Sequence, residues 1–182
     1  MKKISQANVL AKECMVTALM QLVDKKPLSS ISISEITERA GVSRMTYYRN
    51  YSSKEEIFET HMAEIVDSYK NDIAKMEKQE GYGRYRNILH CFTYFERYKD
   101  FIRCLLKVGM GGLLLGALSN YMIETYYIDG DNQELYYALQ AYAGSLFNVY
   151  VAWLNKAAGE PAENMAGIIY KIYREGDTAI RE

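Results

Sequence analysis

The sequence predicts an all-α protein. Hydrophobic residues make up 49% of its 182 residues and recur with helical spacing along most of the chain. Only Pro27 and Pro161 interrupt this pattern, and few stretches alternate apolar and polar residues as a half-buried strand would. We therefore expect a small helical domain over residues 1 to 54 and a larger helical domain over residues 55 to 182.

The first expected helix spans about residues 5 to 24. Its apolar residues lie mostly on one stripe, and the run from Asp24 to Pro27 ends it. The expected stripe consists of Val9, Ala11, Met15, Ala18, Leu19 and Leu22.

A short helix over about residues 35 to 40 comes next. The hydroxyl of Ser34 is suited to cap its free amides, and Ile36 and Ala40 share one apolar face. Gly41 suits the left-handed conformation that ends a helix, since it has no Cβ.

A second short helix follows over residues 44 to 50, with Val42 as the buried residue of the turn and Ser43 as its cap. Two short helices around a glycine turn are the layout of a helix-turn-helix, whose second helix enters the DNA major groove. Arginine and hydroxyl groups suit phosphates, and Arg, Thr, Asn and Met suit base edges or thymine methyls. The residues expected to face outward are Arg44, Met45, Thr46, Tyr47, Tyr48 and Asn50.

A long helix is expected to begin at Ser53, because Ser53 and Glu56 form a capping-box pattern. Lys54 falls on its first turn, where the helix dipole favours anions rather than cations. A DNA phosphate would supply the missing anion. Apolar residues continue at helical spacing as far as Ile73, so this helix is expected to join the two domains.

The stretch from Ile36 to Phe58 resembles the signature of the TetR family of bacterial transcriptional regulators. A hydroxyl residue follows Gly-Val, an aromatic pair ends the second helix, and Ser-Lys-Glu opens the next one. This resemblance implies that Tyr48 and Lys54 hold phosphates, and that Arg44, Thr46 and Tyr47 face bases or flanking backbone. The full set of expected DNA-binding residues is Ser34, Ser43, Arg44, Met45, Thr46, Tyr47, Tyr48, Asn50 and Lys54.

Two positions depart from the family pattern, which usually has His at Asn50 and Phe at Tyr51. Both replacements keep a similar size, so DNA binding is expected to persist with an operator sequence that cannot be read from the chain. The alternative is a helix-turn-helix that packs only against protein. At single positions, Tyr51 fits a core aromatic and Met45 fits a plain solvent-facing residue.

The distribution of charge agrees with a DNA-binding amino terminus. The net charge is −1, but residues 1 to 54 carry nine Lys and Arg against four Asp and Glu, and the remainder is acidic. Because local potential governs attraction to phosphates, the positive charge lies where it is needed.

Further helices are expected at residues 84 to 96, 99 to 107, 110 to 128, 132 to 158 and 162 to 175. The last two form an apolar hairpin, and the family resemblance implies that two such hairpins pair in a homodimer. The bland alternative is that they close the core of a single chain. The expected interface consists of Leu139, Tyr142, Leu146, Tyr150, Trp153, Met165, Ile168, Ile169 and Ile172, with Ala141, Gly144, Ser145 and Ala152 allowing close approach.

The middle helices are expected to enclose an effector pocket. Seventeen tyrosines are present, and a phenol combines apolar packing with a polar tip. No basic cluster accompanies them, so a small apolar or aromatic effector fits better than a sugar phosphate. The expected lining is Cys91, Phe95, Leu106, Met110, Leu114, Tyr121 and Phe147, although each of these also fits a plain core residue.

These elements suggest a repressor on a palindromic double-stranded DNA operator, released when an effector shifts the long helix and separates the two reading helices. The alternative is a coactivator or adaptor acting through another regulator. The carboxy-terminal half resembles a Firmicutes subgroup that includes dihydroxyacetone kinase operon regulators, less specifically than the amino-terminal match.

Other function classes find little support. His61 and His90 lie in separate segments without a catalytic or metal spacing, so we expect no enzyme, metal or cofactor. Three cysteines fit reduced thiols better than a disulfide framework, although a redox sensor at Cys91 or Cys104 stays open. With no expected leader and no apolar run long enough for a bilayer, a cytoplasmic protein is expected.

Overall fold

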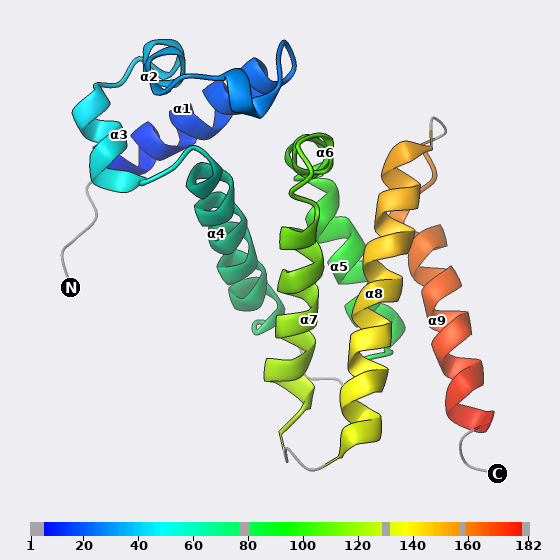
Figure 1. Cartoon of the computed structure of the whole chain (residues 1–182). Helices are drawn as coiled ribbons and strands as arrows, with labels where there is room; N and C mark the ends of the chain where they lie inside the picture. Colours follow the sequence, from blue (N-terminus) through cyan, green and yellow to red (C-terminus); the bar gives the residue numbers. More distant parts are fainter. Residues whose placement is uncertain (1–5, 77–80, 129–131, 157–158, 180–182) are drawn as a thin grey trace. The chain divides into compact units, whose positions relative to one another are not determined.

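The computed structural model describes residues 6–76, 81–128, 132–156 and 159–179 (Figure 1). Within these residues every regular element is helical, which confirms the all-α prediction. The helices are α1 (Gln6–Val23), α2 (Ile33–Ala40), α3 (Arg44–Asn50), α4 (Glu55–Ile73), α5 (Tyr85–Glu96), α6 (Lys99–Lys107), α7 (Gly112–Tyr126), α8 (Gln133–Asn155) and α9 (Ala162–Ala179), with a 3-10 turn, η1 (Leu28–Ser30), between α1 and α2.

The chain folds into two compact units whose boundary lies within α4. The first unit contains residues up to Ile65 together with residues Phe101–Gly111, and the second contains residues Val66–Asp100 and Gly112 onward. The helix α4 therefore contributes to both units, as expected for a helix that joins two domains. The domain boundary between residues 54 and 55 stays a prediction. By compactness, the first part of α4 and most of α6 group with the amino-terminal helices.

In the first unit, α1 packs against α2 and α2 against α3. The core beneath them is formed by fully buried side chains, among them Leu19, Ile36 and Tyr47, and α6 adds Ile102 and Leu105. Val9 was expected on the buried stripe of α1 but is 45% exposed, because the buried face of this helix begins only at Met15.

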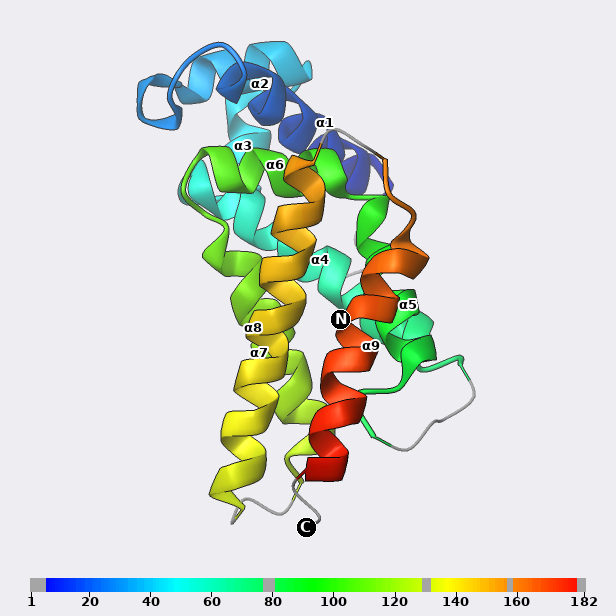
Figure 2. The ribbon, with the colours of Figure 1, turned by 90° about the vertical axis from the view of Figure 1, so that its right-hand side faces the viewer.

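The second unit is a helical bundle in which α8 runs antiparallel to α7 and to α9, and α5 packs against α9 (Figures 1 and 2). Its core is rich in aromatic residues. Tyr142 is 1% exposed and its hydroxyl donates to the Tyr82 carbonyl at 3.1 Å, and the Tyr150 hydroxyl donates to the Phe95 carbonyl at 2.8 Å. Buried phenols are thus placed where their polar tips find backbone acceptors.

Helix α2 begins earlier than expected, and its cap is Ser32 rather than Ser34. The Ser32 hydroxyl accepts a hydrogen bond from the Glu35 amide at 3.3 Å, while a Glu35 carboxylate oxygen accepts from the Ser32 amide at 2.9 Å. This reciprocal pair is a capping box. Serines stand at both positions, so the sequence offers two possible caps. Only Ser32 lies three residues before a glutamate, and the prediction did not use this difference.

The other helix ends follow local rules. Gly41 ends α2 with φ of +66°, in the left-handed conformation predicted for it. Ser53 caps α4 as predicted, since its hydroxyl accepts from the Glu56 amide at 3.1 Å, but Glu56 reaches back to the Ser52 amide. Helix α7 begins at Gly112 instead of residue 110 because Gly109, with φ of +78°, closes α6 first.

The capping assignment is testable with two serines two residues apart. Ser32→Ala removes the cap of α2 and should lower the free energy of unfolding by about 1 kcal/mol. Ser34→Ala serves as the matched control and should change it by less than about 0.5 kcal/mol, since Ser34 caps nothing. Urea unfolding followed by circular dichroism measures both values. Equal losses in the two variants would contradict the assignment.

Candidate functional site

The candidate nucleic-acid interface is the exposed face of α3, and its geometry is set by three anchors. The first is the cap: the Ser43 hydroxyl accepts from the Thr46 amide at 3.1 Å, as predicted. A cap at this position satisfies an amide that a seven-residue helix would otherwise leave unpaired.

The second anchor of α3 is Tyr47, which is completely buried. Its ring lies 5.9 Å from the ring of Tyr51, which is also buried, as predicted for a core aromatic. Burial raises the pKa of the Tyr47 phenol, and its hydroxyl oxygen has no hydrogen-bond partner within the part of the chain described. The prediction that Tyr47 faces bases is therefore wrong. Its position four residues before Tyr51 was the signal that places it on the inner face.

The third anchor joins the end of α3 to the start of α1. Asn50 and Asn8 exchange two side-chain hydrogen bonds at 3.0 and 3.1 Å, and Asn50 also donates to the Thr46 carbonyl at 2.8 Å. Asn50 was expected to point outward to DNA, but these contacts direct its amide toward α1. The sequence could not indicate this contact, because Asn8 lies 42 residues away.

These anchors leave one face of α3 open. Arg44, Met45, Tyr48 and Arg49 are all exposed, and their spacing of i, i+1, i+4 and i+5 places them on one side of the helix. Met45 is 77% exposed and Tyr48 is 59% exposed. Arg49 was missed in the sequence analysis, although it lies five residues after Arg44 and so shares its face. In this structure its guanidinium donates to Asn8 at 3.3 Å.

The remaining predicted DNA-binding residues have other partners. The Ser34 hydroxyl accepts a hydrogen bond from the Arg44 guanidinium, so it holds an exposed arginine at the start of α3. Thr46 is half-buried, and its hydroxyl pairs with that of Ser43 at 3.0 Å. Both residues therefore support the exposed face rather than form it.

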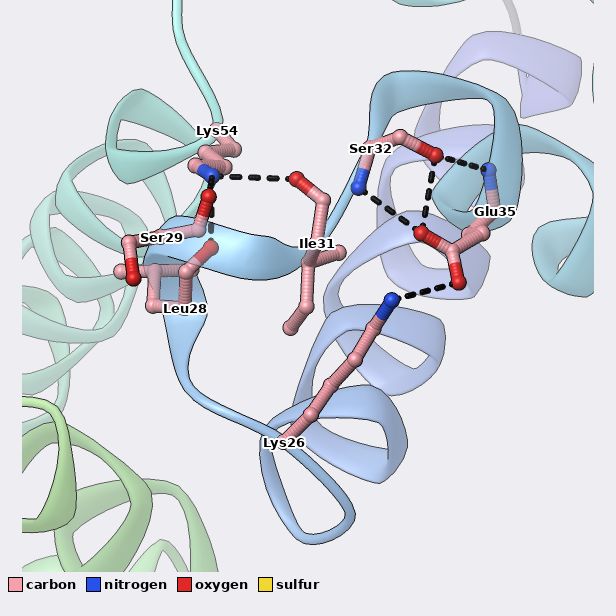
Figure 3. A network of polar contacts seen from close by, with 7 residues as sticks. All are labelled: Lys26, Leu28, Ser29, Ile31, Ser32, Glu35 and Lys54. Atoms are coloured by element: carbon pink, nitrogen blue, oxygen red, sulfur yellow. Dashed lines mark hydrogen bonds and ion pairs between the residues drawn. The ribbon is translucent and has the colours of Figure 1, made fainter.

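Lys54 differs most from its expected role. Its ammonium donates to three backbone carbonyls, those of Leu28 at 2.5 Å, Ser29 at 3.1 Å and Ile31 at 3.0 Å (Figure 3). It lies one residue before α4 rather than on its first turn. The acceptors that its charge requires thus lie within the protein, so a DNA phosphate is not needed to supply them.

Only some of the residues predicted to line an effector pocket border the cavity found in the second unit. A cavity in the second unit has a volume of about 10 Å³, room for roughly one water molecule, and its lining is apolar. It shares Cys91, Phe95 and Leu114 with the prediction, but Tyr121 and Phe147 lie outside the lining, and Leu106 and Met110 belong to the first unit. Its full lining is Cys91, Phe92, Phe95, Leu114, Leu118, Leu146 and Tyr150.

The predicted dimer interface also divides into two groups. Ile168 and Ile172 are 47% and 56% exposed, and so available to a partner. The others are buried within their own chain, because α8 and α9 use those faces against α5, α7 and each other. This second group consists of Leu139, Tyr142, Leu146, Tyr150, Trp153, Met165 and Ile169.

Two cysteines considered for a redox role are buried. Burial raises the pKa of the Cys91 thiol to about 12 and that of Cys104 to about 11, which disfavours the reactive thiolate at both. Among the described residues, no three His, Cys, Asp or Glu side chains are grouped as metal ligands would be.

A membrane-spanning helix was not expected. Within the described ranges, no single helix is long and apolar enough to cross a bilayer, and only α6 and α7 taken together, across their break, pass the same test.

Comparison with known proteins matches the α3 region to regulators. The family described as bacterial regulatory proteins, tetR family, matches residues 16–60. A curated relative, an uncharacterized HTH-type transcriptional regulator, YxbF of Bacillus subtilis, is 34% identical over 71 residues. That match covers 36% of this chain and 19% of the relative, so it spans about a fifth of the relative's length.

Solved structures share the fold over nearly the whole chain. Lin0861 from Listeria innocua has a TM-score of 0.77 at 11% identity and covers 94% of this chain and 93% of its own. A TetR transcriptional regulator from Streptococcus agalactiae has a TM-score of 0.60 at 17% identity, covering 92% and 95%. A TetR transcriptional regulator from Rhodococcus has a TM-score of 0.59 at 20% identity, covering 91% and 94%.

The burial of Tyr47 leads to a prediction that separates packing from DNA contact. Tyr47→Phe removes a buried hydroxyl that has no hydrogen-bond partner in the described part of the chain, so the free energy of unfolding should stay within about 0.5 kcal/mol of the parent or rise. DNA affinity should be unchanged. Tyr47→Ala, which empties the same site, should cost about 3–5 kcal/mol. Thermal unfolding and a gel shift measure both quantities, and lost affinity in a stable Tyr47→Phe protein would indicate a direct role for the hydroxyl.

Proposed function

Because this chain belongs to the TetR family of bacterial transcriptional regulators, we propose that it acts as a dimeric repressor whose operator affinity is lowered by a small apolar effector. The observation that carries the proposal is the exposed face of α3. Four side chains suited to phosphates, base edges or thymine methyls lie together on a helix held at both ends. A rigid helix of this kind can enter a major groove without a further loss of conformational freedom.

Roles along α3 follow from position. Residues at the start of a recognition helix reach base edges, so Arg44 and Met45 are assigned to base contact. Tyr48 and Arg49, a turn later, are assigned to the phosphate backbone. Ser34 and Ser43 support this face through the Arg44 guanidinium and the helix cap.

A homodimer would present two such faces to a palindromic operator. The exposed isoleucines Ile168 and Ile172 lie one turn apart on α9. On α8, an exposed stripe at helical spacing runs through Tyr137, Ala141, Asn148 and Ala152, with small residues that allow a partner helix to approach. Pairing of two copies through these faces would double the DNA contacts of one protein.

The apolar cavity of the second unit supports placing the effector there. Ligand pockets of about 300–1,000 Å³ are usual for small molecules, so a cavity of about 10 Å³ must open for a ligand to enter. Its lining is apolar, and the Tyr150 hydroxyl is already engaged with the Phe95 carbonyl. A compound without charged groups is favoured. Because α4 belongs to both units, a ligand that changes the α4 position in one can change the position of α3 in the other.

The decisive experiment is a gel shift with purified protein and duplex DNA from upstream of its own gene, repeated at several salt concentrations. Tight, salt-sensitive binding supports the proposal, and a titration with uncharged aromatic and aliphatic compounds then tests release. Binding that needs a second protein would favour an adaptor instead. If no compound that binds the protein changes its affinity for DNA, the effector must be removed from the proposal.

Arginine substitutions on α3 should separate base contact from phosphate contact. Arg49→Ala should weaken binding to all duplexes alike and reduce the slope of log affinity against log salt by about 0.9. Arg44→Ala should cost about 1–3 kcal/mol on the preferred site and relax the sequence preference at one position. Lys156→Ala, which removes an exposed charge from the end of α8, is the control and should do neither.

The dimer face has its own test. Ile168→Glu places a charge on the exposed face of α9 and should convert the dimer to a monomer in sedimentation equilibrium, with at least a tenfold loss of operator affinity. Leu10→Glu is the matched control, since Leu10 is 61% exposed on α1 and lies on no proposed interface. A dimer that survives both Ile168→Glu and Ile172→Glu would place the interface elsewhere.

A further inference from the structure

Lys54 makes a contact that the family resemblance does not explain. Its three ammonium hydrogens match the three carbonyl acceptors of Leu28, Ser29 and Ile31, which gather around one nitrogen at 2.5 to 3.1 Å (Figure 3). These carbonyls belong to the 3-10 turn η1 and its end, 23 to 26 residues earlier in the chain. The side chain is half-buried. It therefore links the start of α4 to the connection between α1 and α2.

This connection has little other support. Pro27, Ser29 and Ser30 are exposed and Leu28 is half-buried, so only Ile31, at 3% exposure, anchors the turn through apolar packing. Beside the turn lies an open hollow of about 770 Å³ that is also lined by Val23, Lys107, Val108 and Met110. On that side the turn borders the hollow. The position of the turn thus depends mainly on polar contacts.

The turn leads directly into the start of α2. Ile31, whose carbonyl Lys54 holds, precedes Ser32, the cap of α2. From the other end of the connection, the Lys26 ammonium binds the Glu35 carboxylate at 2.6 Å. Hydrogen bonds from Lys26 and Ser32 lower the pKa of that carboxyl to about 2, so it stays charged at neutral pH. The capping box is therefore fixed to the turn on both sides (Figure 3).

We propose that Lys54 is a positioning residue: its ammonium joins the start of α4 to the turn before α2, so that α2 and α3 follow α4 as one body, and it does not bind a DNA phosphate. The expected effect on DNA affinity rests on the proposed function, because it assumes that α3 contacts DNA. The expected effect on hydrogen exchange in the free protein does not need that assumption. Helix α2 packs against α3, and the hydroxyl of Ser34 on α2 accepts a hydrogen bond from Arg44. A displaced turn would therefore displace the exposed face of α3.

Lys54→Arg tests the proposal because it keeps the charge and changes the geometry. A planar guanidinium binds phosphate at least as well as an ammonium, but it does not match three carbonyls converging on one point. In the free protein, hydrogen exchange at the amides of Ile31, Glu35 and Ile36 should become about tenfold faster in Lys54→Arg and in Lys54→Met. Lys25→Met, an exposed lysine of the same connection, should leave those rates unchanged.

Binding to upstream duplex DNA supplies the second measurement. Positioning predicts that Lys54→Arg and Lys54→Met lose affinity to a similar degree while the salt slope stays within about 0.3 of the parent, because no phosphate contact is lost. Full affinity in Lys54→Arg, with a slope reduced by about 0.9 in Lys54→Met, would establish a phosphate contact and overturn the proposal.

A third measurement needs no variant and covers the case in which substitutions unfold the protein. In the parent chain, the nitrogen-15 signal of the Lys54 ammonium should be visible through slow hydrogen exchange, and it should not shift when duplex DNA is added. A rapidly exchanging ammonium, or one that shifts on DNA binding, would overturn the proposal. If the chain binds no DNA at all, the exchange rates of the free protein still decide the structural part, and only the proposed function fails.

Discussion

Burial of Tyr47 is the constraint on which the exposed face of α3 depends. A helix of seven residues is too short to be stable in water by itself, so its orientation must come from packing. With Tyr47 fully buried, the helical repeat leaves only one choice for its neighbours: Arg44, Met45, Tyr48 and Arg49 must lie on the open side. The phenol hydroxyl, which has no hydrogen-bond partner among the residues described, is the cost of using tyrosine at this position. Apolar packing therefore determines the chemistry that the surface displays.

Local sequence patterns predicted the helices well, because their causes are local. The bounds of α5 and α6 fall within one residue of expectation, and Ser43, Gly41 and Ser53 act at helix ends as their types suggest. Errors arose where two local solutions competed. Ser32 and Ser34 could each cap α2, and only the glutamate three residues after Ser32 decides between them. Similarly, Tyr47 and Tyr48 are adjacent aromatics of which only one can face inward.

Contacts between distant residues could not be read from the chain. The Asn8 pair with Asn50 and the carbonyl cluster around Lys54 bring together residues more than 20 positions apart. The apolar hairpin of α8 and α9 presents a related problem, since leucine, tyrosine and isoleucine suit a chain's own core and a partner equally. Leu139 and Ile169 are fully buried within their own chain, while Ile168, the neighbour of Ile169 in sequence, is exposed. Hydrophobic periodicity identifies apolar faces, but it does not say which surface covers each one.

The supports of α3 differ in how they respond to small displacements. Apolar packing holds α3 firmly within its unit, whereas the connection before α2 is held by lysine ammonium groups beside an open hollow. Close-packed cores resist small displacements, but charge-assisted hydrogen bonds to carbonyls on an exposed turn are lost or reformed at modest cost. Helix α4 begins at this connection and continues into the second unit. If the proposed function holds, a change in the position of α4 would reach the exposed face of α3 through this connection.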